Sequence, residues 1–122
     1  MNAGERRAAW HYRLRGYRIV GVNVQAGRNE LDLIVRRGRD LTFVEVKERR
    51  GAGFGGAVGA VDAEKRRRVR RAARVWLTRN PQPGYVRVGF EVIAVEGGRL
   101  RRIPTSLDDD PPWRPERGGV DD

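Results

Sequence analysis

Four charged residues lie among the alternating apolar residues of one short stretch of the sequence. The stretch is residues 28–47, RNELDLIVRRGRDLTFVEVK, and the four are Glu30, Asp32, Glu45 and Lys47. Apolar residues alternate through two short runs on either side of a turn, which is either Gly38-Arg39 alone or residues 37–40. The pattern predicts a β-hairpin whose strands carry these three carboxylates and the ammonium group.

Both choices of turn give the same pairing of the two strands. They place Asp32 opposite Glu45 and Glu30 opposite Lys47, with all four side chains on one face and opposed Cβ atoms about 5 Å apart. Two carboxylates in such positions repel each other. A shared proton, an arginine or a divalent cation could compensate the repulsion, and Mg²⁺ prefers carboxylate oxygens that leave positions open for water and phosphate.

Lys47 is chemically unusual for this chain. Of the 26 basic residues only Lys47 and Lys65 are lysines. An ammonium is a compact donor that can reach a water and a phosphate oxygen beside a metal ion, where a planar guanidinium is bulkier. The alternative interpretation is that Lys47 balances the charge of Glu30 across the two strands.

The chain has 122 residues and a net charge of +10. Residues 105–122 hold six acidic and two basic residues, so the rest of the chain carries +14. This charge favours a polyanionic partner such as nucleic acid, although an acidic protein or an anionic membrane surface would also suit it. The absence of cysteine excludes disulfides, thiol nucleophiles and cysteine-ligated metals. With no apolar leader or membrane span in the sequence, we expect a cytoplasmic protein that does not contact membranes.

The hydrophobic pattern predicts an α/β fold of the order αβββαβ with an additional edge strand. We expect one domain over residues 1–104 and a disordered, acidic, Pro/Gly-rich tail over 105–122. Asp62 is the expected N-cap of the second helix, and Trp10 and Trp76 are expected in the core. The predicted helices are 5–15 and 62–79, and the predicted strands are 17–25, 30–36, 41–48, 85–95 and 99–103.

The second predicted helix is strongly basic. Seven of the ten residues 65–74 are lysine or arginine. Such a run can be an ordinary solvated face, but solvated faces usually mix both signs of charge. We therefore predict that it contacts phosphates of the nucleic-acid backbone rather than reading base sequence. The predicted contact residues are Lys65, Arg66, Arg67, Arg68, Arg70, Arg71 and Arg74.

An acidic residue on one strand followed by Glu-x-Lys on the next resembles the PD-(D/E)xK nuclease superfamily. Within it, the chain resembles the YraN-like bacterial proteins, which are related to Holliday-junction resolvases. The chain departs from that pattern at Asn29, where glycine is usual, and at Glu91, where aspartate is usual. The matching residues are Glu5, Gly16-Tyr17, Asn23, Glu30-Leu31-Asp32-Leu33-Ile34, Phe43-Val44-Glu45-Val46-Lys47, Arg49, Phe54-Gly55, Lys65, Phe90 and Val92.

The resemblance implies a single restriction-endonuclease-like domain with a mixed central sheet flanked by helices. It implies a metal-dependent endonuclease acting on DNA, in preference to RNA, with branched DNA as a possible substrate and a homodimer as a possible assembly. Asp32, Glu45 and Lys47 would be the catalytic residues, and Asp32, Glu45 and the Val46 carbonyl would hold Mg²⁺ or Mn²⁺. Glu30 and Glu5 are candidate outer ligands, although Glu5 equally suits the N-terminus of a helix.

Two other functions are compatible with the sequence. One is a non-catalytic nucleic-acid-binding module that retains the nuclease fold. The other is an interaction protein whose basic helix docks on an acidic partner.

Overall fold

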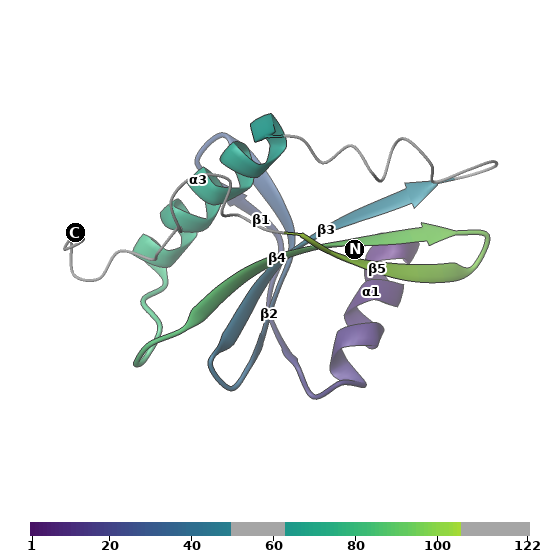
Figure 1. Ribbon diagram of the computed structural model, residues 1–122, viewed down its shortest axis with the longest axis horizontal. Helices are drawn as coiled ribbons and strands as arrows, with labels where there is room; N and C mark the ends of the chain where they lie inside the picture. Colours follow the sequence, from purple (N-terminus) through teal and green to yellow (C-terminus); the bar gives the residue numbers. More distant parts are fainter. Residues whose placement is uncertain (50–62, 106–122) are drawn as a thin grey trace.

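The computed structural model describes residues 1–49 and 63–105 of the chain. Figure 1 shows the predicted αβββαβ order with the additional edge strand, and each boundary lies within two residues of the prediction. The predicted N-cap Asp62 and residues 106–122 of the predicted disordered tail lie outside the described residues, whereas Thr105, predicted as the first residue of the tail, belongs to the last strand. The elements are α1 (Ala3–Arg13), β1 (Arg18–Ala26), β2 (Asn29–Arg37), β3 (Asp40–Arg49), α3 (Ala63–Arg79), β4 (Arg87–Glu96) and β5 (Arg99–Thr105).

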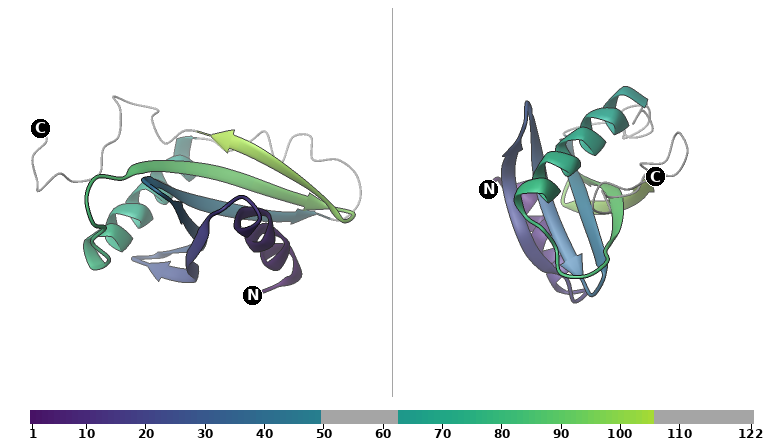
Figure 2. Two further views of the ribbon diagram at one scale, coloured as in Figure 1. Left: turned by 90° about the horizontal axis from the view of Figure 1, so that it is seen from below. Right: turned by 90° about the vertical axis from the view of Figure 1, so that its left-hand side faces the viewer.

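The five strands form one mixed sheet in the order β1-β2-β3-β4-β5. All neighbours are antiparallel except β3 and β4, which run parallel and are separated in the chain by α3. Figure 2 shows the strongly twisted sheet from two further sides. A mixed central sheet flanked by helices confirms the predicted fold class and is consistent with a restriction-endonuclease-like fold.

Of the two described helices, one packs on each face of the sheet, and each face has its own hydrophobic core. On one face Val69, Ala72, Ala73 and Trp76 of α3 pack on strand residues including Phe43. On the other face, Ala8 and Tyr12 of α1 pack on strand residues that include Leu33, Val44 and Ile93. The two helices lie toward different ends of the strands, α3 at the upper left and α1 at the lower right of Figure 1.

Local sequence signals account for several boundaries. A capping box between Asn2 and Glu5 begins α1, and Gly16 adopts φ +87° in the turn that follows the C-cap Leu14. The β2–β3 hairpin closes through Gly38-Arg39, the two-residue choice of turn, with Gly38 at φ +59°. The prediction that Trp10 is in the core is wrong: the residue is 58% exposed, because α1 turns its small residues and Tyr12 toward the sheet.

Neither described helix is long and apolar enough to cross a membrane.

Candidate functional site

The predicted hairpin register is correct, but β2 leaves β3 before it reaches the carboxylates. The ladder extends from Arg37–Asp40 to Leu33–Val44 and ends there. The predicted oppositions of Asp32 with Glu45 and of Glu30 with Lys47 are therefore not ladder pairs, and Glu30 pairs with Gln25 of β1 instead. At the point of separation the backbone N–H of Val46 donates to Asp32 Oδ2 at 2.8 Å. The carboxylate thus holds the two strands where the main-chain ladder stops.

A change of face in the β1–β2 ribbon accompanies this separation. Side chains two residues apart on a strand normally share a face. Here two successive residue pairs of the β1–β2 ladder pack on opposite faces of the sheet. The first pair belongs to the core with α1, and the second pair belongs to the core with α3. Between them lie Asn23 and Asp32, and Asn23 has φ +47°, the one positive φ of a non-glycine residue in the described ranges. The two flanking pairs are Val22 with Leu33 and Val24 with Leu31.

In the sequence Asn23 was noted only because it matches the family pattern, and the structure shows a local role for an asparagine at this position. Asparagine tolerates the left-handed conformation better than most residues. Its side-chain amide donates to Glu5 Oε2 at 3.0 Å. Asn23 therefore turns β1 over beside Asp32 and at the same time joins the strand to the first turn of α1.

A cavity of about 200 Å³ lies between the separating strands and α3. Three of the predicted carboxylates, Glu30, Asp32 and Glu45, line it together with cations from α3 and from the β1–β2 turn. Its floor is apolar and belongs to the α3 core. The remaining lining residues are Arg28, Asn29, Leu31, Phe43, Val44, Lys65, Arg68, Val69, Ala72 and Phe90.

Asp32 is the most electrostatically perturbed member of this group. Burial raises the pKa of its carboxyl from the ordinary 3.8 to about 6. The hydrogen bond from Val46 lowers this pKa, whereas the negative charges of Glu45, Glu5 and Glu30 raise it further. The raised pKa of Asp32 therefore reflects first its burial and then its position among other carboxylates.

Glu45 has a partner that the sequence did not predict. The ammonium of Lys65, from the first turn of α3, lies 3.2 Å from Glu45 Oε2. Lys65 was predicted on the outer, phosphate-binding surface of the helix, and the structure places it in the carboxylate cavity instead. The helix positions this side chain because Val69, one turn further on, is buried against the sheet and fixes the rotation of α3.

Lys47 lies two residues beyond Glu45 on β3, at the level of Ala94 on β4. Its side chain is half-buried, and it makes no hydrogen bond or ion pair with the described part of the chain. The cavity lining formed by the described residues includes Lys65 and Arg68 but not Lys47. The alternative role of Lys47 as a cross-strand partner of Glu30 is wrong, because β2 has left β3 at that level.

Glu5 is 8% exposed and belongs to the first turn of α1. Its carboxylate accepts from the backbone N–H of Asn2 at 3.0 Å and from the Asn23 amide at 3.0 Å. The predicted role of a helix N-terminal acid is confirmed. Because its charge also raises the pKa of Asp32, Glu5 belongs to the electrostatic surroundings of the same site.

The carboxylates are not assembled into a finished metal centre. Among residues 1–49 and 63–105 no three acidic or histidine side chains are grouped closely enough to hold an ion together. The reason lies in their present partners: Asp32 bonds to Val46, Glu45 to Lys65, and Glu5 to Asn2 and Asn23.

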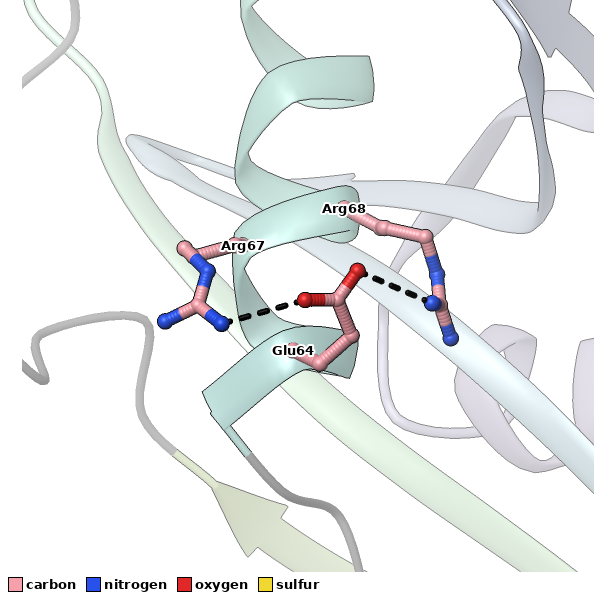
Figure 3. A network of polar contacts seen from close by, with 3 residues as sticks. All are labelled: Glu64, Arg67 and Arg68. Carbon is pink, nitrogen blue, oxygen red and sulfur yellow. Dashed lines mark hydrogen bonds and ion pairs between the residues drawn. The ribbon is translucent and has the colours of Figure 1, made fainter.

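Five arginines of α3 line two separate hollows of the surface. Arg68 lines the carboxylate cavity, and a separate hollow of about 230 Å³ is lined by Arg67, Arg70, Arg71 and Arg74. Figure 3 shows Glu64 between Arg67 and Arg68; it accepts from Arg67 at 3.0 Å and from Arg68 at 3.2 Å. Arg66 is half-buried. The basic run is therefore not one continuous surface, and Glu64 offsets part of its charge.

Comparison with known proteins identifies the family. The profile of the uncharacterised protein family UPF0102 matches residues 4–95. A UPF0102 protein of Methylorubrum extorquens is 47% identical over 96 residues, which are 78% of this chain and 73% of that protein. The UPF0102 protein YraN of Escherichia coli O139:H28 is 38% identical over 96 residues, with the same coverage of 78% and 73%. A UPF0102 protein of Rhizorhabdus wittichii is 54% identical over 76 residues, 62% of this chain, and the match spans 63% of that relative. The chain belongs to the UPF0102 family.

Proposed function

We propose that this member of the UPF0102 family is a metal-dependent endonuclease that hydrolyses phosphodiester bonds in DNA. One observation carries the proposal: Glu30, Asp32 and Glu45 line a single cavity with Lys65 and Arg68, at the point where two strands separate. Carboxylate oxygens suit a hard divalent cation, and the adjacent cations suit the phosphate that the ion would activate. The resemblance to PD-(D/E)xK nucleases supports the same conclusion.

The residues present fit Mg²⁺ or Mn²⁺ in their chemistry. Asp32 and Glu45 would hold the ion together with the Val46 carbonyl, and Glu30 and Glu5 are the candidates for outer contacts through water. When bound, such an ion lowers the pKa of a coordinated water and offsets charge on the phosphate. The raised pKa of Asp32 agrees with this assignment, because an added positive charge would relieve the repulsion among the carboxylates.

The other groups have separate tasks in this proposal. Lys47, next to the site along β3, would orient the attacking water. The arginines of α3 would hold the phosphate backbone on either side of the scissile bond, because their contacts depend on charge and not on base sequence. Branched DNA is the substrate we favour. A homodimer would place two such sites on two strands. A DNA substrate and the cysteine-free sequence agree with a location in the cytoplasm.

A second candidate function is a non-catalytic nucleic-acid-binding module. It is favoured by one observation: Asp32 and Glu45 are occupied by protein partners, and no three acidic or histidine side chains of the described residues are grouped closely enough to hold an ion. In this case the cavity would be a relic of the nuclease fold, and only the basic surfaces would act.

Titration of Mg²⁺ and Mn²⁺ into the wild type and into Asp32→Asn, followed by calorimetry, distinguishes the two functions. Branched, duplex and single-stranded DNA, and RNA of matched sequence, are then incubated with each protein and separated on gels. The nuclease proposal predicts metal uptake and metal-dependent cleavage by the wild type, both lost in Asp32→Asn. DNA binding without metal uptake at millimolar concentration would leave the binding module as the function.

A further inference from the structure

We propose that Lys65 is a catalytic residue that acts by changing partners. It neutralises Glu45 while the site holds no metal, and it binds a non-bridging oxygen of the scissile phosphate once a divalent cation has taken its place on Glu45. The inference rests on the proposed function and goes beyond it, since it assigns to the site a phosphate-binding cation that comes from α3 and not from the β3 motif.

The position of the Lys65 side chain is the first argument. Its ammonium lies 3.2 Å from Glu45 Oε2, and the two side chains are only 28% and 18% exposed. Lys65 lines the same cavity as Asp32 and Glu30. A phosphate that entered this cavity to reach the carboxylates would therefore meet this ammonium.

Competition for Glu45 is the second argument. The oxygen that accepts from Lys65 belongs to one of the two carboxylates expected to bind the cation most directly. A cation on that carboxylate repels the ammonium beside it, so uptake of the ion weakens the ion pair. A partly buried ammonium still requires a counter-charge, and the phosphate of the substrate supplies one in the same cavity.

The residue type is the third argument. Apart from Lys47, every other basic residue of the chain is arginine, yet a lysine stands at this position. A guanidinium in its place can hold a carboxylate through two parallel hydrogen bonds and would be difficult to displace. An ammonium is a point charge on a flexible stem, which can move from a carboxylate to a nearby phosphate with little rearrangement.

The test measures metal affinity and cleavage separately in Lys65→Ala. Removal of the competing ammonium should tighten binding of Mn²⁺ or Mg²⁺ by about threefold to tenfold in calorimetry without DNA. Loss of the phosphate contact should lower the single-turnover cleavage rate by roughly 100-fold at saturating metal. A purely structural role would not tighten metal binding, so the opposite signs of the two effects are the diagnostic result.

Two variants control the experiment. Arg68→Gln removes a positive charge from the same cavity, but its guanidinium pairs with Glu64 and not with Glu45, so we expect a smaller change in metal affinity. Lys65→Arg retains the charge, and we expect weaker metal binding than in the wild type. Thermal unfolding shows whether each variant is folded, and Lys65→Met replaces Lys65→Ala if the alanine variant is not.

Each outcome decides a different point. Metal affinity in Lys65→Ala equal to or weaker than that of the wild type would overturn the exchange of partners. Tighter metal binding with an unchanged cleavage rate would overturn the catalytic role and leave Lys65 as a counter-ion. If the wild type itself takes up no metal, the proposed nuclease function fails and this inference fails with it, which the same titration reveals before any variant is compared.

Discussion

Replacement of Asp32 by asparagine should make the metal-free protein more stable at neutral pH, although it destroys the proposed metal site. Asparagine has nearly the same shape and can still accept the hydrogen bond from Val46. What it removes is the negative charge that lies among Glu45, Glu5 and Glu30. The variant therefore isolates the electrostatic penalty of a carboxylate at this position.

The size of the effect follows from the pKa of Asp32. A folded pKa of about 6 against an ordinary 3.8 corresponds to about 3 kcal/mol. Because the side chain is half-buried and solvent screens its neighbours, we expect about 1–2 kcal/mol. A carboxyl with a raised pKa binds its proton more tightly in the folded state than in the unfolded state. The stability of the wild type relative to Asp32→Asn therefore falls as the pH rises from about 4 to about 6 and stays lower above that.

Urea unfolding in EDTA at pH 4 and pH 8 measures this difference. We expect the two proteins to have similar free energies of unfolding at pH 4 and Asp32→Asn to be more stable at pH 8. Asp40→Asn is the control of opposite sign, because the hydrogen bond from Arg87 lowers the pKa of Asp40 and its charge is stabilising at pH 8. The reasoning is refuted if Asp32→Asn shows no gain at pH 8, or the same gain at both values.

Three further predictions concern groups around the site. Asn23→Gly tolerates the left-handed backbone and loses only the hydrogen bond to Glu5, whereas Asn23→Ala loses this bond and also strains the backbone. In urea unfolding Asn23→Ala should therefore be about 1 kcal/mol less stable than Asn23→Gly. Equal stabilities of the two variants would contradict the role of the positive φ. Glu64→Gln should raise DNA affinity by about twofold to threefold at low salt, because it releases Arg67 and Arg68 from their ion pairs. Fluorescence anisotropy at several salt concentrations should also show a steeper salt dependence of binding. An unchanged affinity would show that these arginines do not contact DNA. Burial alone would raise the pKa of Glu91, but the hydrogen bonds from Arg102 and Tyr12 lower it, so the ionised carboxylate stabilises the fold. Glu91→Gln should therefore lower the free energy of unfolding by about 1 kcal/mol at pH 7. This loss should disappear as the pH falls through the folded pKa of Glu91, and a loss that persists in acid would point to packing instead.

The sequence was sufficient for the elements and the hairpin register because both depend on local patterns. Alternating apolar residues and the Gly38 turn fix which residues of β2 and β3 face each other. The place where the ladder ends could not be predicted from the hairpin alone. It depends on the third strand, where Asn23 turns the ribbon over, and on the side chain of Asp32, which takes the N–H of Val46.

The position of Lys65 was missed for a different reason. In a run of basic residues longer than two turns, some side chains must point toward the sheet, and which ones do so depends on the rotation of the helix. Val69 and Ala72 fix that rotation through the core. The apolar stripe was visible in the sequence, and Lys65 precedes Val69 by four residues. This spacing puts the two residues on the same side of the helix and could have predicted that Lys65 faces the sheet. The spacing of Asn2 and Glu5, which form a capping box, was the signal that places Glu5 in the first turn of α1.

Two unfavourable features of the described structure coincide at one place. Asn23 has the one left-handed backbone of a non-glycine residue in the described ranges, and Asp32 has a carboxyl pKa raised toward neutrality. The two residues lie across from each other between consecutive pairs of the β1–β2 ladder. Backbone strain and uncompensated charge both lower stability, so a fold shaped only for stability would have little reason to place them together. A bound cation would relieve the charge of Asp32, which lines the cavity beside the turned ribbon. The coincidence supports the proposed cation site through an observation that is separate from the sequence motif.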